Sequence, residues 1–123
     1  MSIGEPFPIM ASNTILYCRY WQETVSFYRD MLALPITFAS DWFIEFQISS
    51  TAYLSIADER RATIKSSQGK GVTLTFRVHN VHEIWNSLSA RGVKLGPIQE
   101  HAWGAQVFYF NDPEGYRLEI WAG

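Results

Sequence analysis

Apolar residues recur at intervals of three or four positions in two separate parts of the chain. The first stripe consists of Trp21, Val25, Tyr28 and Leu32. The second stripe consists of Val81, Ile84, Trp85 and Leu88. This spacing places apolar side chains on one face of a helix, so each stripe predicts an amphipathic helix. Pro35 and Gly92 are expected to end the two helices. Asn80, with Glu83 three residues later, predicts an N-terminal cap for the second.

Short apolar and aromatic runs surround both helical stripes and predict β-strands. In the first half of the chain these runs cover residues 13–19, 36–39, 43–48 and 52–56. In the second half they cover residues 72–78, 93–95, 106–110 and 116–121. Each half therefore has the order strand, helix, three strands.

The two halves match when 60 is added to the residue numbers of the first. This shift carries Trp21, Val25 and Tyr28 onto Val81, Trp85 and Leu88, and Asn13 onto Thr73. A repeated unit with one exposed sheet face must pair to close a core or a cleft. The sequence predicts an α+β fold with an arm at 1–12, a first βαβββ module at 13–57, a linker at 58–71 and a second module at 72–123.

Composition narrows the class of protein. The chain has 123 residues, 47% of them apolar and 15% aromatic, which indicates one folded domain rather than a disordered chain. A net charge of −2 gives no basic footprint for nucleic acid, and no apolar run is long enough to span a membrane. A single cysteine, Cys18, and an N-terminus without a signal-peptide pattern lead us to expect a cytoplasmic protein.

The stretch 106–121 predicts a β-hairpin with one unusual residue. Its turn, Asn-Asp-Pro-Glu-Gly, has a proline suited to the second turn position and a glycine that tolerates positive φ. Glu119 is the only carboxylate in the apolar second strand. A carboxylate on a half-buried strand is costly unless it faces a cleft or a partner, so Glu119 is the first candidate for a functional residue.

The chain resembles a known superfamily in these motifs. The helix sequence Phe27-Tyr28-Arg29-Asp30-Met31-Leu32, the pair Trp103-Gly104 and the segment Asp112-Pro-Glu-Gly-Tyr-Arg-Leu-Glu119 are similar to glyoxalase/bleomycin-resistance/dioxygenase proteins, also called vicinal oxygen chelate proteins. The resemblance implies two βαβββ modules whose curled mixed sheets surround a ligand cleft. It also implies a homodimer, with a divalent ion on the concave side in the metal enzymes.

The resemblance also indicates which positions would hold such a metal. These are Asn13, Ser55, Thr73 and Glu119, where metal-binding members carry mostly His and Glu. An amide and two hydroxyls are weak neutral donors, whereas catalytic zinc or iron sites need about three imidazole or carboxylate ligands. We therefore expect no metal site and no cofactor, beyond a loosely held divalent ion through Glu119. Glu119 would be a catalytic residue only if the protein is an enzyme.

The remaining candidates would line an aromatic ligand cleft. Asn13, Thr73, Arg77 and Glu119 are expected to supply polar contacts, and Trp42, Phe46, Trp103, Tyr109 and Trp121 aromatic surface, about half of the aromatics filling the core instead. His79, His82 and His101 are expected in solvent, and Cys18 as a buried, inert thiol.

Three functions follow from this interpretation. The favoured one is metal-free binding of an antibiotic-like or aromatic small molecule, neutral or anionic, by a homodimer. The alternative is a metal-dependent lyase or dioxygenase with an incomplete metal site centred on Glu119. A non-catalytic dimerisation or interaction module is the third. The sequence favours binding over catalysis and leaves the identity of the ligand open.

Overall fold

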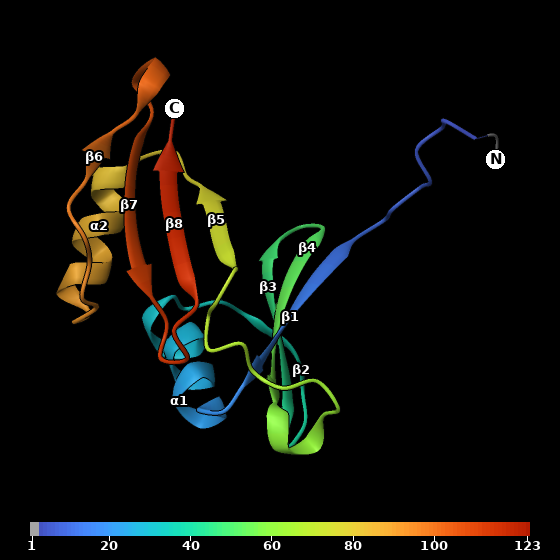
Figure 1. Cartoon of the computed structure of the whole chain (residues 1–123). Helices are drawn as coiled ribbons and strands as arrows, with labels where there is room; N and C mark the ends of the chain where they lie inside the picture. Colours follow the sequence, from blue (N-terminus) through green and yellow to red (C-terminus); the bar gives the residue numbers. More distant parts are fainter. Residues whose placement is uncertain (1–2) are drawn as a thin grey trace.

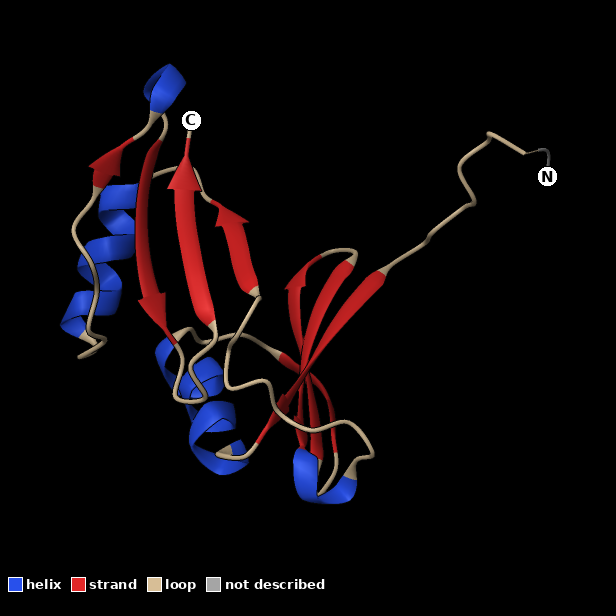
Figure 2. Cartoon of the chain, viewed as in Figure 1, coloured by secondary structure: helices blue, strands red, loops and turns tan. Residues whose placement is uncertain are grey.

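The computed structural model describes residues 3–123, which form two four-stranded sheets with a helical segment against each (Figures 1 and 2). The first sheet and its helices comprise β1 (Ser12–Cys18), α1 (Trp21–Ser26), a π-helical turn (Phe27–Met31), β2 (Ile36–Ala39), β3 (Phe43–Ser49) and β4 (Ala52–Asp58). The second comprises β5 (Thr73–Arg77), α2 (Val81–Ala90), β6 (Gln99–Glu100), β7 (Gln106–Asn111) and β8 (Arg117–Ala122). Short 3₁₀ turns cover Glu59–Arg61 and Ala102–Gly104.

Both sheets have the same topology. The strand order is β1-β4-β3-β2 in the first and β5-β8-β7-β6 in the second. In each sheet the strand before the helix pairs in parallel with the last strand of its module, and the other pairings are antiparallel. The α+β fold with two βαβββ modules is thus confirmed. No helix within residues 3–123 has both the length and the apolar character to cross a membrane.

Local sequence explains how the helices begin and end. The Asn80 side chain accepts a hydrogen bond from the backbone N–H of Glu83 at 3.2 Å, the cap that the sequence predicts. Gly92 follows α2 with a φ of 88°, a conformation that glycine adopts without strain. The first helix is shorter than its apolar stripe suggests, because after Ser26 the chain widens into the π-helical turn, in which Leu32 N–H bonds to Phe27 C=O.

One apolar core joins the two modules. It contains Phe46 and Leu54 from the first sheet, Phe108 and Leu118 from the second, and Tyr28 from the π-helical turn, all at 0% exposure. The helix-covered faces of both sheets therefore share this core. The opposite face of each sheet lies on the outside, and this arrangement positions every candidate site below.

One expectation from the sequence is wrong at this level, and the place of one candidate aromatic is now clear. Residues 93–95 do not form a strand: Val93 and Leu95 pack on the core from a loop, and the edge strand is the polar pair Gln99–Glu100. Phe46 is among the candidate aromatics that fill the core, as expected for about half of them. It alternates along β3 in step with buried Ile44, so its ring points into the core.

Candidate functional site

The outer face of the second sheet gathers the polar and aromatic candidates. Leu118 and Ile120 of β8 are buried on the helix side, so the residues that alternate with them project outward. We call this outer surface the Glu119 face. It includes Thr73, Thr75, Arg77, Tyr109, Arg117, Glu119 and Trp121.

Glu119 is held by its neighbours on both adjacent strands. The register places Glu119 opposite Thr75 of β5 and opposite Tyr109 of β7. The Thr75 hydroxyl donates to Glu119 Oε1 at 2.5 Å. On the other side, hydrogen bonding with the Glu119 carboxylate raises the pKa of the Tyr109 phenol above the usual range. The carboxylate in the middle of the face thus accepts a hydrogen bond from Thr75 and lies beside the Tyr109 phenol.

Two guanidinium groups lie over aromatic rings of the same face. The Arg117 guanidinium carbon is 4.9 Å from the centre of the Tyr109 ring. The Arg77 guanidinium carbon is 5.2 Å from the centre of the Trp121 ring. Arg117 also donates to Thr73 Oγ1 at 3.0 Å. The face therefore combines flat apolar surface with two cations around one carboxylate, the mixture expected of a site that stacks and orients a polar aromatic molecule.

The outer face of the first sheet carries a second, neutral-to-acidic network. The Ser55 hydroxyl donates to Asn13 Oδ1 at 2.9 Å, and Asn13 Nδ2 donates to Glu45 Oε2 at 3.4 Å. Thr37 donates to Glu45 Oε1 at 2.8 Å. These four residues define the Asn13 face. In the first sheet Glu45 lies opposite Ser55, and in the second sheet Tyr109 lies opposite Glu119. The two modules therefore repeat the same strand geometry with different side chains at the equivalent positions.

The structure brings most of the predicted site residues together. Thr73, Arg77, Tyr109, Glu119 and Trp121 share the Glu119 face, whereas Asn13 belongs to the other sheet. Trp42 lies half-buried in the turn before β3, with its ring edge-to-face on Phe43 at 5.5 Å.

Trp103 lies outside the sheet altogether. The sequence predicts it at a strand edge, but it occupies the 3₁₀ turn Ala102–Gly104 with a φ of 68° and a fully exposed side chain. The 3₁₀ turn lies between β6 and β7 (Figure 1), and the Trp103 side chain is fully exposed there rather than packed on the Glu119 face.

Sequence reasoning missed Thr75 and Glu45. Glu45 is the single acid in an apolar strand, so the criterion that selected Glu119 would have found it as well. Thr75 could be found only from the parallel register that places it beside Glu119. The histidines His79, His82 and His101 are exposed, as expected.

The four positions that correspond to a family metal site do not fit a transition metal. Asn13 Oδ1 is engaged by Ser55, and Thr73 Oγ1 accepts from the Arg117 guanidinium, a cation that opposes a metal ion. Glu119 is the only carboxylate among the four. Within residues 3–123, no three His, Cys, Asp or Glu side chains converge in a metal-binding group. The donor set is thus one carboxylate among weak neutral oxygens.

The Asp-Pro-Glu-Gly turn is a structural connection between the modules. Asp112 Oδ1 accepts from the backbone N–H groups of Glu114, Gly115 and Tyr116, each at 3.0 Å, which closes the turn. Its other oxygen accepts from the Tyr28 hydroxyl at 2.6 Å. Burial raises the pKa of the Asp112 carboxyl, and these hydrogen bonds oppose the rise.

Glu114 extends this connection to the start of the first helix. Its carboxylate, 4% exposed, accepts from the backbone N–H groups of Arg19 at 2.9 Å and Tyr20 at 2.7 Å, and from the Ser66 hydroxyl. Nearby, Cys18 is buried, and this burial with the adjacent carboxylates raises the pKa of its thiol far above the usual range. All these polar groups are satisfied internally, so this buried cluster stabilises the junction and offers no reactive group.

Comparison with known proteins decides the family. A model of the glyoxalase-like domain matches residues 11–122, almost the whole chain. The chain belongs to the glyoxalase-like domain family. This membership confirms the resemblance to the glyoxalase/bleomycin-resistance/dioxygenase superfamily. Among curated relatives of this glyoxalase-like protein is YraH of Bacillus subtilis (strain 168), which is uncharacterized; it is 27% identical over 114 residues, 82% of this chain and 88% of the relative.

Solved structures extend the likeness to the fold. Lactoylglutathione lyase from Agrobacterium tumefaciens is 19% identical, with a TM-score of 0.78 over 97% of this chain and 96% of that one. A bleomycin resistance determinant encoded on the transposon Tn5 is 16% identical, with a TM-score of 0.71 over 91% and 96%. At these identities the glyoxalase-like fold is shared, and the chemistry of this protein is argued from its own residues.

Proposed function

We propose that this glyoxalase-like protein is a small-molecule binding protein that holds a planar aromatic ligand, neutral or anionic, against the Glu119 face. The observation that carries the proposal is the pair of guanidinium–aromatic contacts, Arg117 over Tyr109 and Arg77 over Trp121. Guanidinium groups bind carboxylates through paired N–H donors, and these planar groups, held over Tyr109 and Trp121, can themselves stack on an aromatic ring of the ligand. Glu119 can accept hydrogen bonds from hydroxyl or amino groups of the same ligand.

A homodimer is part of this proposal. In a single chain the helix side of the second sheet packs into the core, and the Glu119 face on its other side is open. Ligand pockets enclose most of the ligand surface, which one open sheet face cannot do. A sheet of a second copy of the chain would supply the facing wall, so that the two curled sheets enclose a cleft between them.

Binding is favoured over catalysis because of the chemistry of the face. A metal-dependent lyase or dioxygenase would need stronger ligands than Asn13, Ser55 and Thr73 beside Glu119. The Glu119 face also argues against bleomycin, since a cationic drug is attracted to acidic clefts and this one presents two guanidinium groups.

The binding test uses benzoate, cinnamate and naphthoate, each with its matched aryl alcohol and aryl amine. We expect the carboxylates to raise Tm and to quench tryptophan fluorescence more strongly than the amines, since a ligand that binds only the folded state stabilises it. Arg117→Gln should weaken carboxylate binding about tenfold, or about 1.4 kcal/mol, and Trp121→Leu should weaken all the aryl ligands. Arg29→Gln, an exposed arginine paired with Asp30, is the matched control.

The two alternative functions, a metal-dependent enzyme and a non-catalytic interaction module, predict different results for metal content and ligand binding. Metal content is measured after purification without a tag, and again after addition of manganese, iron, nickel or zinc. One tightly held ion per chain, lost in Glu119→Ala, would overturn the binding proposal and direct the work to lyase assays with lactoylglutathione and to dioxygenase assays. A dimer that no aryl ligand stabilises would support the interaction module instead.

A further inference from the structure

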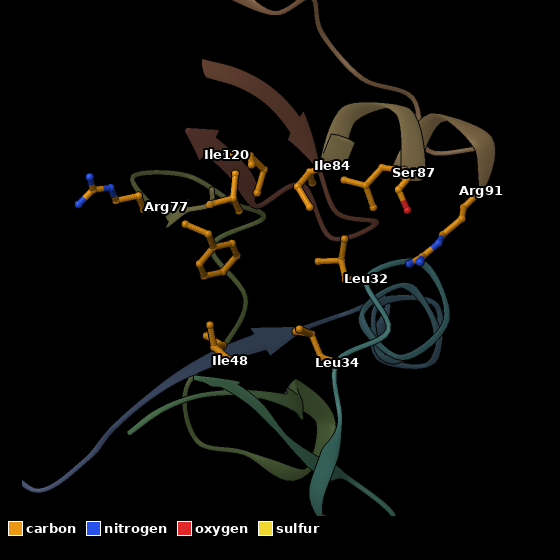
Figure 3. A pocket seen from close by; sticks show the side chains of 11 residues that line it. Leu32, Leu34, Ile48, Arg77, Ile84, Ser87, Arg91 and Ile120 are labelled. Carbon is orange, nitrogen blue, oxygen red and sulfur yellow. The ribbon is translucent and has the colours of Figure 1, made fainter. Parts of the chain in front are cut away.

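A pocket of about 360 Å³ lies at the junction of the two modules, on the opposite side of the second sheet from the Glu119 face (Figure 3). Phe76 of β5 and Ile120 of β8 form its sheet wall. They alternate along their strands with Arg77 and Glu119, which point to the other face. The pocket and the proposed ligand face therefore lie on opposite sides of the same two strands, and Arg77 is the one residue that belongs to both.

The walls of this junction pocket are almost entirely apolar. Ile84 and Leu88 of α2 line one side, and Leu34 and Ile48 of the first module line the other. Its volume is at the lower end of the range of ligand pockets in proteins. Water in such a space finds few hydrogen-bond partners, whereas a short hydrocarbon body would remove several half-buried apolar side chains from solvent.

The polar groups of the pocket lie together at one end. Figure 3 shows Ser87, in the last turn of α2, and Arg91, directly after the helix, at the same rim, while Arg77 points away from the pocket. The Arg91 Nη1 donates to the Met31 carbonyl oxygen at 2.6 Å, which fixes the guanidinium at this rim and leaves its other N–H groups for a ligand. No Asp or Glu is among the lining residues. Arg77 and Arg91 are the charged residues that line the pocket.

We infer that the junction pocket binds a small amphipathic carboxylate, with its hydrocarbon chain between Phe76, Ile84 and Leu34 and its carboxylate at Arg91 and Ser87. The apolar walls select the chain, and the guanidinium selects the negative head group over a neutral or positive one. Binding would place a ligand between the two modules, since the walls come from both.

The experiment measures binding of octanoate, octanol and octylamine to the full chain by calorimetry and thermal shift. Octanoate should bind best and octylamine least. Arg91→Gln should weaken octanoate about tenfold and leave octanol unchanged. Ile84→Trp, which fills the pocket, should abolish binding of both. Ser87→Trp blocks the rim without entering the core and keeps the test valid if Ile84→Trp does not fold; Ser89→Trp, on the same helix but outside the pocket, is its matched control.

Three results would overturn the inference. The first is equal binding of octanoate and octylamine, or no binding of either. The second is octanoate binding that survives Ser87→Trp but is lost in Arg117→Gln, which would place the ligand on the Glu119 face. The third is a fall in native mass by analytical ultracentrifugation in Ser87→Trp but not in Ser89→Trp, which would make the pocket a contact between two copies of the chain.

Discussion

Removing one hydroxyl group tests whether the buried connection between Tyr28 and Asp112 stabilises the fold. Tyr28 is fully buried, Asp112 is 5% exposed, and the hydroxyl donates to the carboxylate at 2.6 Å. Tyr28→Phe keeps the ring and leaves a buried carboxylate oxygen without this donor. Hydrogen bonds to charged groups contribute about 1.5–3 kcal/mol, so we expect the free energy of unfolding to fall by about 2 kcal/mol. For a chain of this size the corresponding fall in Tm is roughly 6–10 °C.

The same variant makes a prediction about pH. Burial raises the folded-state pKa of Asp112, so its favourable contribution to stability is complete below its unfolded-state pKa and declines as pH rises through the folded-state pKa. The Tyr28 hydroxyl opposes this rise, and its removal raises the pKa further. The variant should therefore lose more stability than the parent over the same rise in pH. The difference between them should be smallest at acid pH and largest near neutrality.

Urea unfolding followed by far-UV circular dichroism measures both effects across a pH series. Tyr20→Phe is the control, because the Tyr20 side chain is half-exposed and its loss of a hydroxyl leaves no buried group without a partner. The free energy of unfolding of this variant is expected to stay within about 0.5 kcal/mol of the parent. A loss in Tyr28→Phe no greater than in the control, or one that does not change with pH, would refute the reasoning.

Two further changes test the packing around the Asp-Pro-Glu-Gly turn. Gly69→Ala should cost more than about 1 kcal/mol, because Gly69 has a positive φ and an added methyl would overlap the carbonyl of Gly115. Gly71→Ala has a similar φ with open space around it, so equal losses in the two variants would argue against the clash. The Cys18 thiol should resist a thiol reagent at pH 8 in the folded protein and react fully in guanidinium, and rapid labelling of the native protein would contradict its burial.

The sequence predicts the fold well because the periodicities are strong. The stripe of Val81 and Leu88 faces the core as expected, and the match of the two halves anticipates their equal topology. The failures are local. Val93 and Leu95 are apolar without being a strand, since a three-residue run cannot be distinguished from a loop that packs on the core. The π-helical turn leaves no signal in the spacing of apolar residues.

The candidate site is only partly readable from the sequence. Glu119 is visible because a single acid in an apolar strand requires a partner. Its partners are not, because Thr75 and Tyr109 become neighbours only through the strand register. The environment of Trp103 depends on one left-handed residue conformation, and no residue type at that position announces it.

The segment between the modules has a consequence for protein engineering. Residues 59–71 are polar and rich in glycine and serine, the composition usually chosen for inserting a tag or opening a new terminus. Here Ser66 donates to Glu114 and Gly69 packs against Gly115, so this segment is bound to the hairpin rather than free. A fusion partner inserted there is expected to disrupt these contacts with the hairpin. The extended residues 3–11, which lie away from both sheets in Figure 1, are the better place for an affinity tag or a surface anchor.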